Sequence, residues 1–477
     1  MHPCQTCQAS SCPATLSRRR FLTGAAAAAA TVAGRMGLFD FASSLSATEP
    51  NPPGQPVINV VFIRPEQAPI VSWPGGNCDV PAQQALFTRT LADAAKLLDV
   101  RLEVRHKPLS QAGEVGEYLQ QLKQAPPDGL LVCAMELVLW EPVNQIIQHR
   151  GDLPLLVYSN VTGFTQQLQT GRDAPRVYVG ATQEVGWLAT GLRLLSAIPR
   201  LKQTRVLFVA GNDTRDQVIE GLGTTFHWIP KARFAQAFKQ VGPTKEVRAI
   251  ADFYIRNARK IVEPKAPDVL EAAKNYVVCR RLMELENCQG IAIDCLGWQN
   301  PVCLAFSKLR DQGIVAVCEQ DTNATIGMLL THLLAGRPCF QQDPSPNTVN
   351  NTLIGAHCTS PLRLEGFDQP YRAPYLLRDY HTRTGVSPQV LWPPGQPVTI
   401  LQANLKPLSV MLGTGRVVAN VAQPPSGCCR TAVEIELDGV ADTRDVKGFH
   451  QHFVLGNLAR PFKAYGRLAG IPVTPIC

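Results

Sequence analysis

The sequence lacks any cluster of lysine and arginine interleaved with aromatic residues outside its first 47 residues. A surface that binds nucleic acid needs such a basic patch, so we expect no nucleic-acid partner. The formal net charge of +8 does not alter this, because residues 1–47 hold four arginines against a single aspartate. A repeat at a fixed period is also lacking, so repeat architectures are not expected.

Charged residues are scarce, at 18% of the chain against 45% hydrophobic residues. This balance is typical of a folded soluble protein and not of a disordered one. A chain of 477 residues is expected to form two or three domains. The 15 cysteines are diluted over this length, and many lie within apolar runs, as Cys133 and Cys318 do. We therefore expect buried thiols at such strand positions and not a disulfide framework.

The first 47 residues have the pattern of a twin-arginine export signal. Arg18 and Arg19 lie in the run Ser-Arg-Arg-Arg-Phe-Leu, which precedes an alanine-rich stretch too short to span a bilayer as a stable helix. The pattern predicts that the twin-arginine translocase exports the folded chain to the periplasm or another extracytoplasmic space. Cys4, Cys7 and Cys12 precede the arginines without a convincing fourth ligand, so we interpret them as incidental.

Beyond a proline-rich linker at residues 48–56, short apolar runs alternate with helical patterns. Such runs suggest strands buried on both faces of parallel sheets, so the predicted fold class is α/β. After about residue 340, frequent proline and glycine with short hairpin-like strands predict a mostly antiparallel β domain, closed by a helix at about 451–469. The expected domains are two Rossmann-like parallel α/β domains and a C-terminal β-rich domain, at residues 57–165, 166–338 and 339–477.

Three residues from distant segments could hold a metal ion. Glu319 directly follows the apolar strand Ile-Val-Ala-Val-Cys, and the carboxyl end of a buried parallel strand is where α/β proteins place their sites. Asp343 comes just past the next helix, and His450 lies ahead of the predicted last helix. Two carboxylates and an imidazole suit a divalent cation of the Mn²⁺ type, although such triples are common in long chains.

Residues 318–345, 350–361 and 448–473 carry a resemblance to a known family. These segments resemble the L-fucose isomerase and L-arabinose isomerase family, in which a strand-end Glu precedes a helix and an acidic ligand follows that helix. A His then stands before the final helix, whose tail runs into Gly-Ile-Pro-Val at 470–473. The resemblance covers about residues 290–477, is weak over 57–250 and is absent from the leader.

The resemblance implies a metal-dependent aldose–ketose isomerase that acts on an open-chain sugar through an enediolate. It implies that Glu319 and Asp343 are both metal ligands and the acid–base pair, and that His450 is a pure ligand. His452 is the alternative to His450. His357, in the run Gly-Ala-His-Cys, matches a further ligand of the arabinose branch.

Other implications concern the substrate and the assembly. Arg64, in an Ile-Arg-Pro run, is similar to a segment near the start of fucose isomerases and implies a substrate contact. The family implies a homo-oligomer, a hexamer by resemblance. Phe449 stands where fucose isomerases have Asn, and the chain is shorter than those enzymes. The resemblance therefore does not identify which sugar is the substrate. Two alternatives also stay open: an exported sugar-binding protein without catalysis, and a metal-assisted sugar epimerase.

Overall fold

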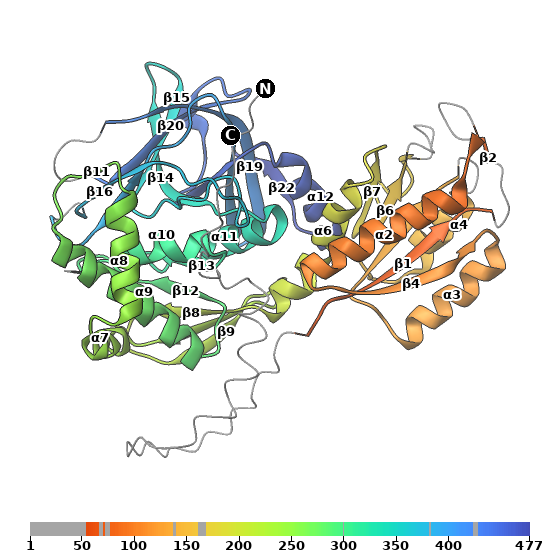
Figure 1. Cartoon of the computed structure of the whole chain (residues 1–477). Coiled ribbons are helices and arrows are strands. Elements are labelled where there is room, and N and C mark those ends of the chain that lie inside the picture. The colour runs from red at the N-terminus through yellow and green to blue at the C-terminus, as the bar shows by residue number, and fades with distance from the viewer. Residues whose placement is uncertain are drawn as a thin grey trace, which may run out of the picture. The chain divides into compact units, whose positions relative to one another are not determined.

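The computed structural model describes residues 54–65, 70–71, 77–136, 140–160, 168–298, 300–380, 383–422 and 428–477. The export signal predicted at 1–47, with Arg18, Arg19, Cys4, Cys7 and Cys12, lies outside the described residues. The protein is of mixed α/β class, with two largely parallel sheets and a C-terminal antiparallel sheet (Figure 1). In the described part of the chain, no helix has the length and apolar character needed to cross a membrane.

The first sheet has five parallel strands in the order β4-β1-β5-β6-β7. Its strands are β1 (Val57–Ile63), β4 (Arg101–Leu109), β5 (Gly129–Ala134), β6 (Leu155–Ser159) and β7 (Val177–Ala181). Its helices are α2 (Val80–Leu98), α3 (Ala112–Gln124), α4 (Trp140–His149) and α6 (Trp187–Gln203), and a short antiparallel pair joins β2 (Ile70–Val71) to β3 (Asn77–Cys78). Because β7 belongs to this sheet, the sheet continues past residue 165, the expected end of the first domain.

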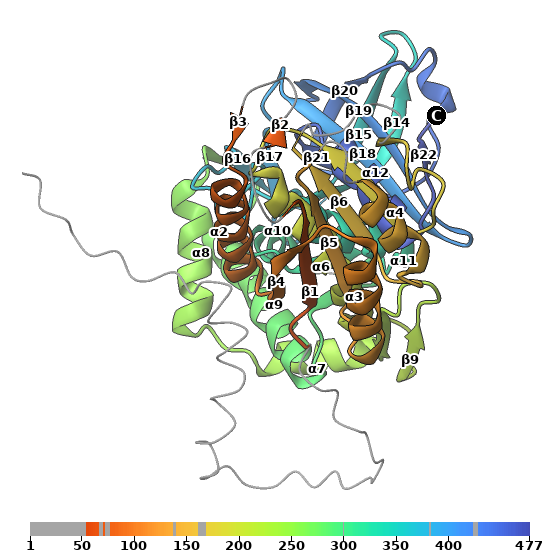
Figure 2. The same ribbon diagram turned by 90° about the vertical axis from the view of Figure 1, so that its right-hand side faces the viewer.

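Different helices cover the two faces of the first sheet, because successive side chains of a strand point to opposite faces. Along β1, Ile58, Val60 and Phe62 pack with α2 and α6, whereas Val61 and Ile63 pack with α3 and α4. Figure 2 shows α2 and α3 on opposite sides of the strands. Burial on both faces explains why these strands are nearly continuous apolar runs, which is the pattern that predicted parallel sheets.

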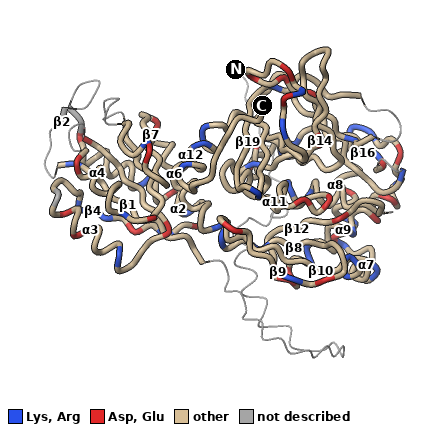
Figure 3. Tube along the Cα trace, turned by 180° about the vertical axis from the view of Figure 1, so that it is seen from behind, with Lys and Arg blue, Asp and Glu red and all other residues tan. Residues whose placement is uncertain are grey.

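The second sheet has the order β13-β12-β8-β10-β9, and only its edge strand β9 is antiparallel. Its strands are β8 (Arg205–Val209), β9 (Arg215–Val218), β10 (Thr225–Ile229), β12 (Gly290–Ile293) and β13 (Val315–Cys318). Its helices are α7 (Lys231–Gln240), α8 (Lys245–Asn257), α9 (Ala266–Leu285), α10 (Cys303–Asp311) and α11 (Thr322–Ala335). Acidic and basic residues are interspersed along these elements (Figure 3).

The C-terminal region is a closed antiparallel sheet in the order β18-β21-β14-β15-β20-β19, because β19 pairs back with β18. Its strands are β14 (Phe340–Asn347), β15 (Thr352–His357), β18 (Pro397–Leu405), β19 (Leu408–Asn420), β20 (Thr431–Leu437) and β21 (Gln451–Leu455). Smaller elements are β11 (Lys260–Ile261), β16 (Tyr375–Arg378), β17 (Ser387–Val390), the 3₁₀ helix η2 (Thr443–Asp445) and β22 (Val473–Pro475). The prediction of a mostly antiparallel C-terminal region is confirmed.

The last helix begins later than the sequence pattern predicted. Residues 451–455 form β21, and α12 spans only Ala459–Ala469. β21 pairs with β14 on one side and with β18 on the other, and all five of its residues are buried. Such two-sided pairing in a packed interior outweighs local helical preference, so the expected first turns of this helix are wrong.

Helices α10 and α11 lie between the second sheet and the closed sheet (Figure 1). α11 packs against β13 of the second sheet and also against β18 and β21 of the closed sheet. Gly336 ends this helix in a left-handed conformation (φ 61°), as a glycine stop does, and Pro338 follows it. The arrangement brings the turn after β13, which carries Glu319, next to the strands of the closed sheet.

Candidate metal centre

Glu319 is presented by a tight turn between a buried strand and a helix. β13 is buried at all four positions, and Glu319 and Gln320 then adopt left-handed backbone conformations with φ of 61° and 51°. Asp321 begins α11, because its Oδ1 accepts a hydrogen bond from the Ala324 amide at 2.7 Å. Left-handed conformations are unfavourable for non-glycine residues and gather at functional sites, so this turn is a candidate site on backbone grounds alone.

Buried polar side chains hold the end of β13 in place. The Gln341 side chain accepts a hydrogen bond from the Cys318 amide at 3.0 Å and donates one to the Cys318 carbonyl at 3.3 Å. Arg310, which is fully buried, donates to the Ala316 carbonyl at 2.9 Å and to Gln341 at 3.1 Å. These contacts fix the backbone immediately before Glu319 and join it to β14, the strand that carries Asp343.

Strand pairing within the closed sheet brings the other three residues together. Asp343 lies on β14 opposite Ala356 of β15, so it is close to His357 at the end of that strand. β14 also pairs with β21, and His450 directly precedes β21. His450 has a left-handed backbone (φ 51°), so its side chain does not follow the alternation of side chains between the two faces of β21. The middle of β14, the end of β15 and the start of β21 thus meet the turn after β13.

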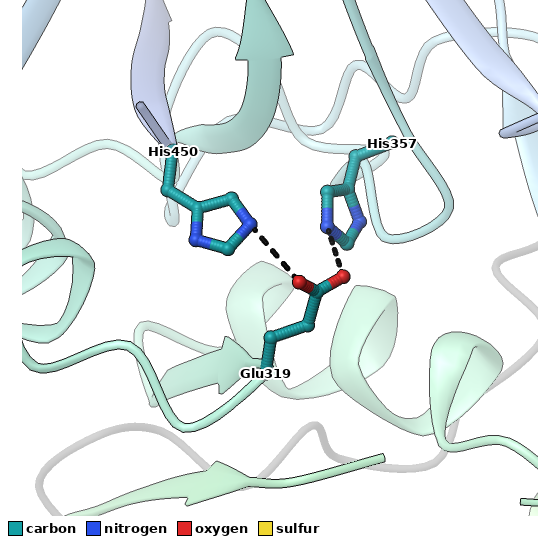
Figure 4. A group of neighbouring side chains, drawn as sticks. All are labelled: Glu319, His357 and His450. Carbon is teal, nitrogen blue, oxygen red and sulfur yellow. Dashed lines mark ion pairs between the residues drawn. The ribbon is translucent and has the colours of Figure 1, made fainter. Parts of the chain in front are cut away.

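The donor atoms of the cluster lie close to one another. Glu319 contacts His357 (Oε1 to Nε2, 3.6 Å) and His450 (Oε2 to Nε2, 3.4 Å). His450 Nε2 also lies 3.2 Å from Asp343 Oδ1. One donor atom from each of Glu319, His357 and His450 falls within 4.8 Å of the others. Figure 4 shows both imidazoles directed at the Glu319 carboxylate.

Several of these atoms are close without being hydrogen-bonded. His450 Nε2, Asp343 Oδ1 and both ring nitrogens of His357 are buried and make no hydrogen bond of acceptable geometry. Buried polar atoms normally have a partner, so four such atoms in one place require an explanation. Imidazole nitrogens and carboxylate oxygens that converge on a shared space fit a divalent cation, which would satisfy His450 Nε2, Asp343 Oδ1 and one of the two nitrogens of His357.

Electrostatics in the cluster couple the histidines to the carboxylates. The close contacts with His357 and then with His450 hold the pKa of Glu319 far below its usual range. Burial lowers the pKa of His450, but Asp321, Asp343 and Glu319 outweigh it and raise that pKa to about 11. Burial also lowers the pKa of His357, but neighbouring groups, Cys318 first among them, outweigh burial and raise that pKa to about 10. A cation that replaced these protons would satisfy the same carboxylates.

Asp321 is a site residue that the sequence did not indicate. Its Oδ2 lies 2.8 Å from His450 Nδ1, while its other oxygen caps α11. A histidine whose second nitrogen is held by a carboxylate has its tautomer and ring orientation fixed for a cation at the first nitrogen. The sequence shows Asp321 only as a helix cap, because the contact with His450 spans 129 positions of the chain.

The structure brings together Glu319, Asp343, His357 and His450, but not every predicted residue. His452 is fully buried on β21 with its ring against Gly327 of α11, so it does not join the cluster. Arg64 lies at the end of β1 in the first sheet, where its guanidinium donates to Gln84 at 2.7 Å and to the Pro65 carbonyl at 2.7 Å.

Comparison with known proteins adds no further relationship to these observations. The chain matches no family model, and it matches no curated protein.

Proposed function

We propose that the protein is a metal-dependent aldose–ketose isomerase that acts on an open-chain sugar of the L-fucose or L-arabinose type. The observation that carries the proposal is the convergence of Glu319, Asp343, His357 and His450 from four separate segments, with unsatisfied donor atoms facing one space. The segments that converge are those whose sequences resemble the fucose and arabinose isomerase family.

The donor set supports Mn²⁺, or another divalent first-row cation, as the cofactor. Carboxylate oxygens suit Mg²⁺ and Mn²⁺, whereas imidazole nitrogens suit transition metals, so a mixed set favours a transition metal with affinity for oxygen. The side chains of Glu319 and Asp343 are 25% and 37% exposed, while that of His450 is 3% exposed. The carboxylates therefore face the side from which a sugar would enter, and the histidines form the buried wall.

The residues divide the proposed reaction between them. A divalent cation bound here would polarise the sugar carbonyl and stabilise the negative charge of an enediolate. Glu319 would accept a proton from one carbon of the sugar and return it to the neighbouring carbon. Asp343 would carry the hydroxyl proton from one oxygen to the next, and Asp321 would keep His450 in one orientation.

The remaining parts of the proposal concern architecture and setting. The first sheet places β1 between β4 and β5, and the second places β8 between β10 and β12. A first strand that lies inside the sheet is found in doubly wound folds, and this supports the interpretation of both parallel sheets as Rossmann-like. We also propose that the chain is exported by the twin-arginine translocase and assembles as a homo-oligomer, a hexamer by resemblance. Arg64 remains a proposed sugar contact.

Turnover by the Mn²⁺-loaded full chain tests the proposal. Ketose formation would be followed from L-fucose, L-arabinose and D-arabinose, for the parent chain, Glu319→Gln and Glu117→Gln. Loss of an acid–base carboxylate that also binds the cation should lower kcat by at least about 100-fold. Glu117 lies exposed on α3, so Glu117→Gln should behave as the parent chain does.

The other outcomes separate the alternatives. Exchange of the C2 hydrogen with solvent without ketose formation would favour a metal-assisted epimerase. Sugar binding with neither turnover nor Mn²⁺ binding would overturn the isomerase proposal in favour of an exported binding protein.

A further inference from the structure

Three cysteine side chains gather beside the metal centre. Cys303 is the first residue of α10, Cys358 directly follows His357, and Cys429 lies just before β20. Cys303 and Cys358 pack together with Tyr380, and Cys429 packs against the same group. The three thiols come from segments far apart in the sequence, so the fold and not local spacing brings them together.

Cys358 is the thiol shared by the other two. Its side chain interacts by hydrogen bonding with that of Cys303, which raises the pKa of Cys358, and also with that of Cys429. In the described part of the chain, only Glu319, His357 and His450 supply three donors close enough to hold one ion. The cysteines therefore form neighbouring pairs around Cys358 and not a three-thiolate metal site.

Exposure differs between the two possible partners of Cys358. Cys303 is 3% exposed and Cys358 is 1% exposed, whereas Cys429 is only partly buried. An oxidant in solution therefore reaches Cys429 before it reaches the others. Cys428, the preceding residue, is partly buried as well, but it does not belong to the packed group.

We propose that Cys358 and Cys429 are a redox modification site that forms a reversible disulfide. The oxidant is a small-molecule disulfide. The Cys429 thiol gives its proton to solvent, and the thiolate attacks one sulfur of the oxidant; a mixed disulfide forms, and the released thiolate takes up a proton. The Cys358 thiol then gives its proton to solvent and attacks the Cys429 sulfur, and the second thiolate leaves and takes up a proton. Two protein thiols are oxidised and one disulfide is reduced to two thiols. An extracytoplasmic space would favour this product.

The disulfide would act on the neighbouring site, a consequence that rests on the proposed metal function. Cys358 is joined by one peptide bond to His357, and its carbonyl accepts a hydrogen bond from Ser387 at 2.8 Å. His357 is in turn paired with Thr431, close to Cys429 in the chain. Drawing the two sulfurs into a covalent bond between these strand ends changes the direction of the His357 ring. We expect Mn²⁺ affinity to fall about tenfold or more.

Peptide mapping of the full chain tests the linkage directly. The protein is treated with oxidised glutathione, its remaining thiols are alkylated, and the digest is examined by mass spectrometry. We expect a Cys358–Cys429 linkage that dithiothreitol reverses. It should survive in Cys428→Ser and vanish in Cys429→Ser, and these adjacent substitutions are matched controls. Alkylated Cys358 in the oxidised protein, or Cys358 linked to Cys303 in the parent chain, would overturn the assignment.

A Mn²⁺ titration of the reduced and oxidised protein then tests the consequence. A linkage without change in Mn²⁺ affinity would overturn the effect on the metal centre, while the modification site itself would stand. Absence of Mn²⁺ binding in the reduced protein would count against the proposed function, and the peptide map would still decide the linkage. The two failures are therefore distinguishable.

Discussion

Two clusters in the molecule place histidine among carboxylates, and they are completed in opposite ways. In the second sheet, His227 of β10 lies between Asp216 (Nδ1 to Oδ1, 2.6 Å) and Glu286 (Nε2 to Oε2, 3.0 Å). Arg205 pairs with Asp216 at 2.7 Å, and Arg233 pairs with Glu286 at 2.7 Å. Each ring nitrogen has a carboxylate and each carboxylate has an arginine, so this cluster is complete without a ligand.

The metal centre lacks that balance. Glu319, Asp321 and Asp343 have only histidines as ion-pair partners among the described residues. Atoms of Asp343, His357 and His450 also stay without a hydrogen bond, although they are buried. The comparison teaches that histidine and carboxylate in contact do not by themselves indicate a metal site. Unsatisfied donors and the absence of an arginine counter-charge distinguish the cluster that fits a cation from the one that is a structural network.

The largest expected effect comes from removing one histidine from each cluster and comparing the two variants. His450→Gln should lower Mn²⁺ affinity by more than about 100-fold, because it removes a buried nitrogen that faces two carboxylates. His227→Gln removes a histidine with the same types of neighbour and should leave Mn²⁺ affinity unchanged. Isothermal titration of both variants with Mn²⁺ measures the difference. Equal affinities in the two variants would remove the distinction drawn here between open and complete clusters.

Asp321 gives the next largest effect, and two substitutions separate its two roles. Serine caps helices, so α11 should keep its first turn in Asp321→Ser. Serine cannot reach His450, whereas the single acceptor oxygen of asparagine can turn from the Ala324 amide to accept a hydrogen bond from His450 Nδ1. Mn²⁺ affinity should therefore fall about 10- to 100-fold in Asp321→Ser and less in Asp321→Asn. If Asp321→Ser binds Mn²⁺ as tightly as the parent chain, Asp321 is only a helix cap.

His357 tests whether the centre uses three protein ligands or four. His357→Gln should weaken Mn²⁺ binding by about tenfold if the ring supplies a fourth donor. His452→Gln is the matched control, because His452 is equally buried but lies against α11. Mn²⁺ titrations below the unfolding temperature of each variant provide the measurement. A larger loss in His452→Gln than in His357→Gln would reverse the assignment of the two histidines.

The strand-end position of Glu319 could be predicted because it depends on local pattern. A short apolar run predicts a buried strand, and Gly336 with Pro338 marks the end of the following helix. The positions of Asp343, His357 and His450 depend on pairing among β14, β15 and β21, which no local pattern specifies. The sequence could therefore name Asp343 and His450 as candidate ligands but could not show that they meet, and His452 stayed an alternative to His450 because both precede the same helix.

The errors have the same origin. Residues 451–455 carry a helical pattern, but strands on both sides pair with them. β7 lies beyond the predicted end of the first domain, because membership of a sheet is decided by its partner β6 and not by the intervening segment. Asp321 was missed because its contact with His450 spans 129 positions of the chain and depends on tertiary packing that no local pattern specifies.

The smallest expected effect is on the pH dependence of stability, and it belongs to the complete cluster. The hydrogen bond with Glu286 raises the pKa of His227 above its ordinary value of 6.5. The hydrogen bond with His227 lowers the pKa of Glu286 below its ordinary value of 4.5. Burial raises the pKa of Asp216, but hydrogen bonds from Arg205 and His227 outweigh burial and lower that pKa below 3.8. The contribution of His227 to the free energy of unfolding is fully present below pH 6.5 and is lost as pH rises through the raised pKa of His227. The contributions of Asp216 and Glu286 are present above pH 4.5 and are lost as pH falls through their lowered pKa values.

His227→Gln should therefore reduce the free energy of unfolding most between about pH 4.5 and 6.5. We expect a loss of about 1–2 kcal/mol there, at the low end for a charged hydrogen bond because the Asp216 side chain is 49% exposed. The difference from the parent chain should shrink as pH rises, since the parent histidine then loses its proton too. Urea unfolding of metal-free protein across this range measures it. A difference that grows with pH would mean that His227 is neutral in the folded chain, and the cluster would then be no more complete than the metal centre.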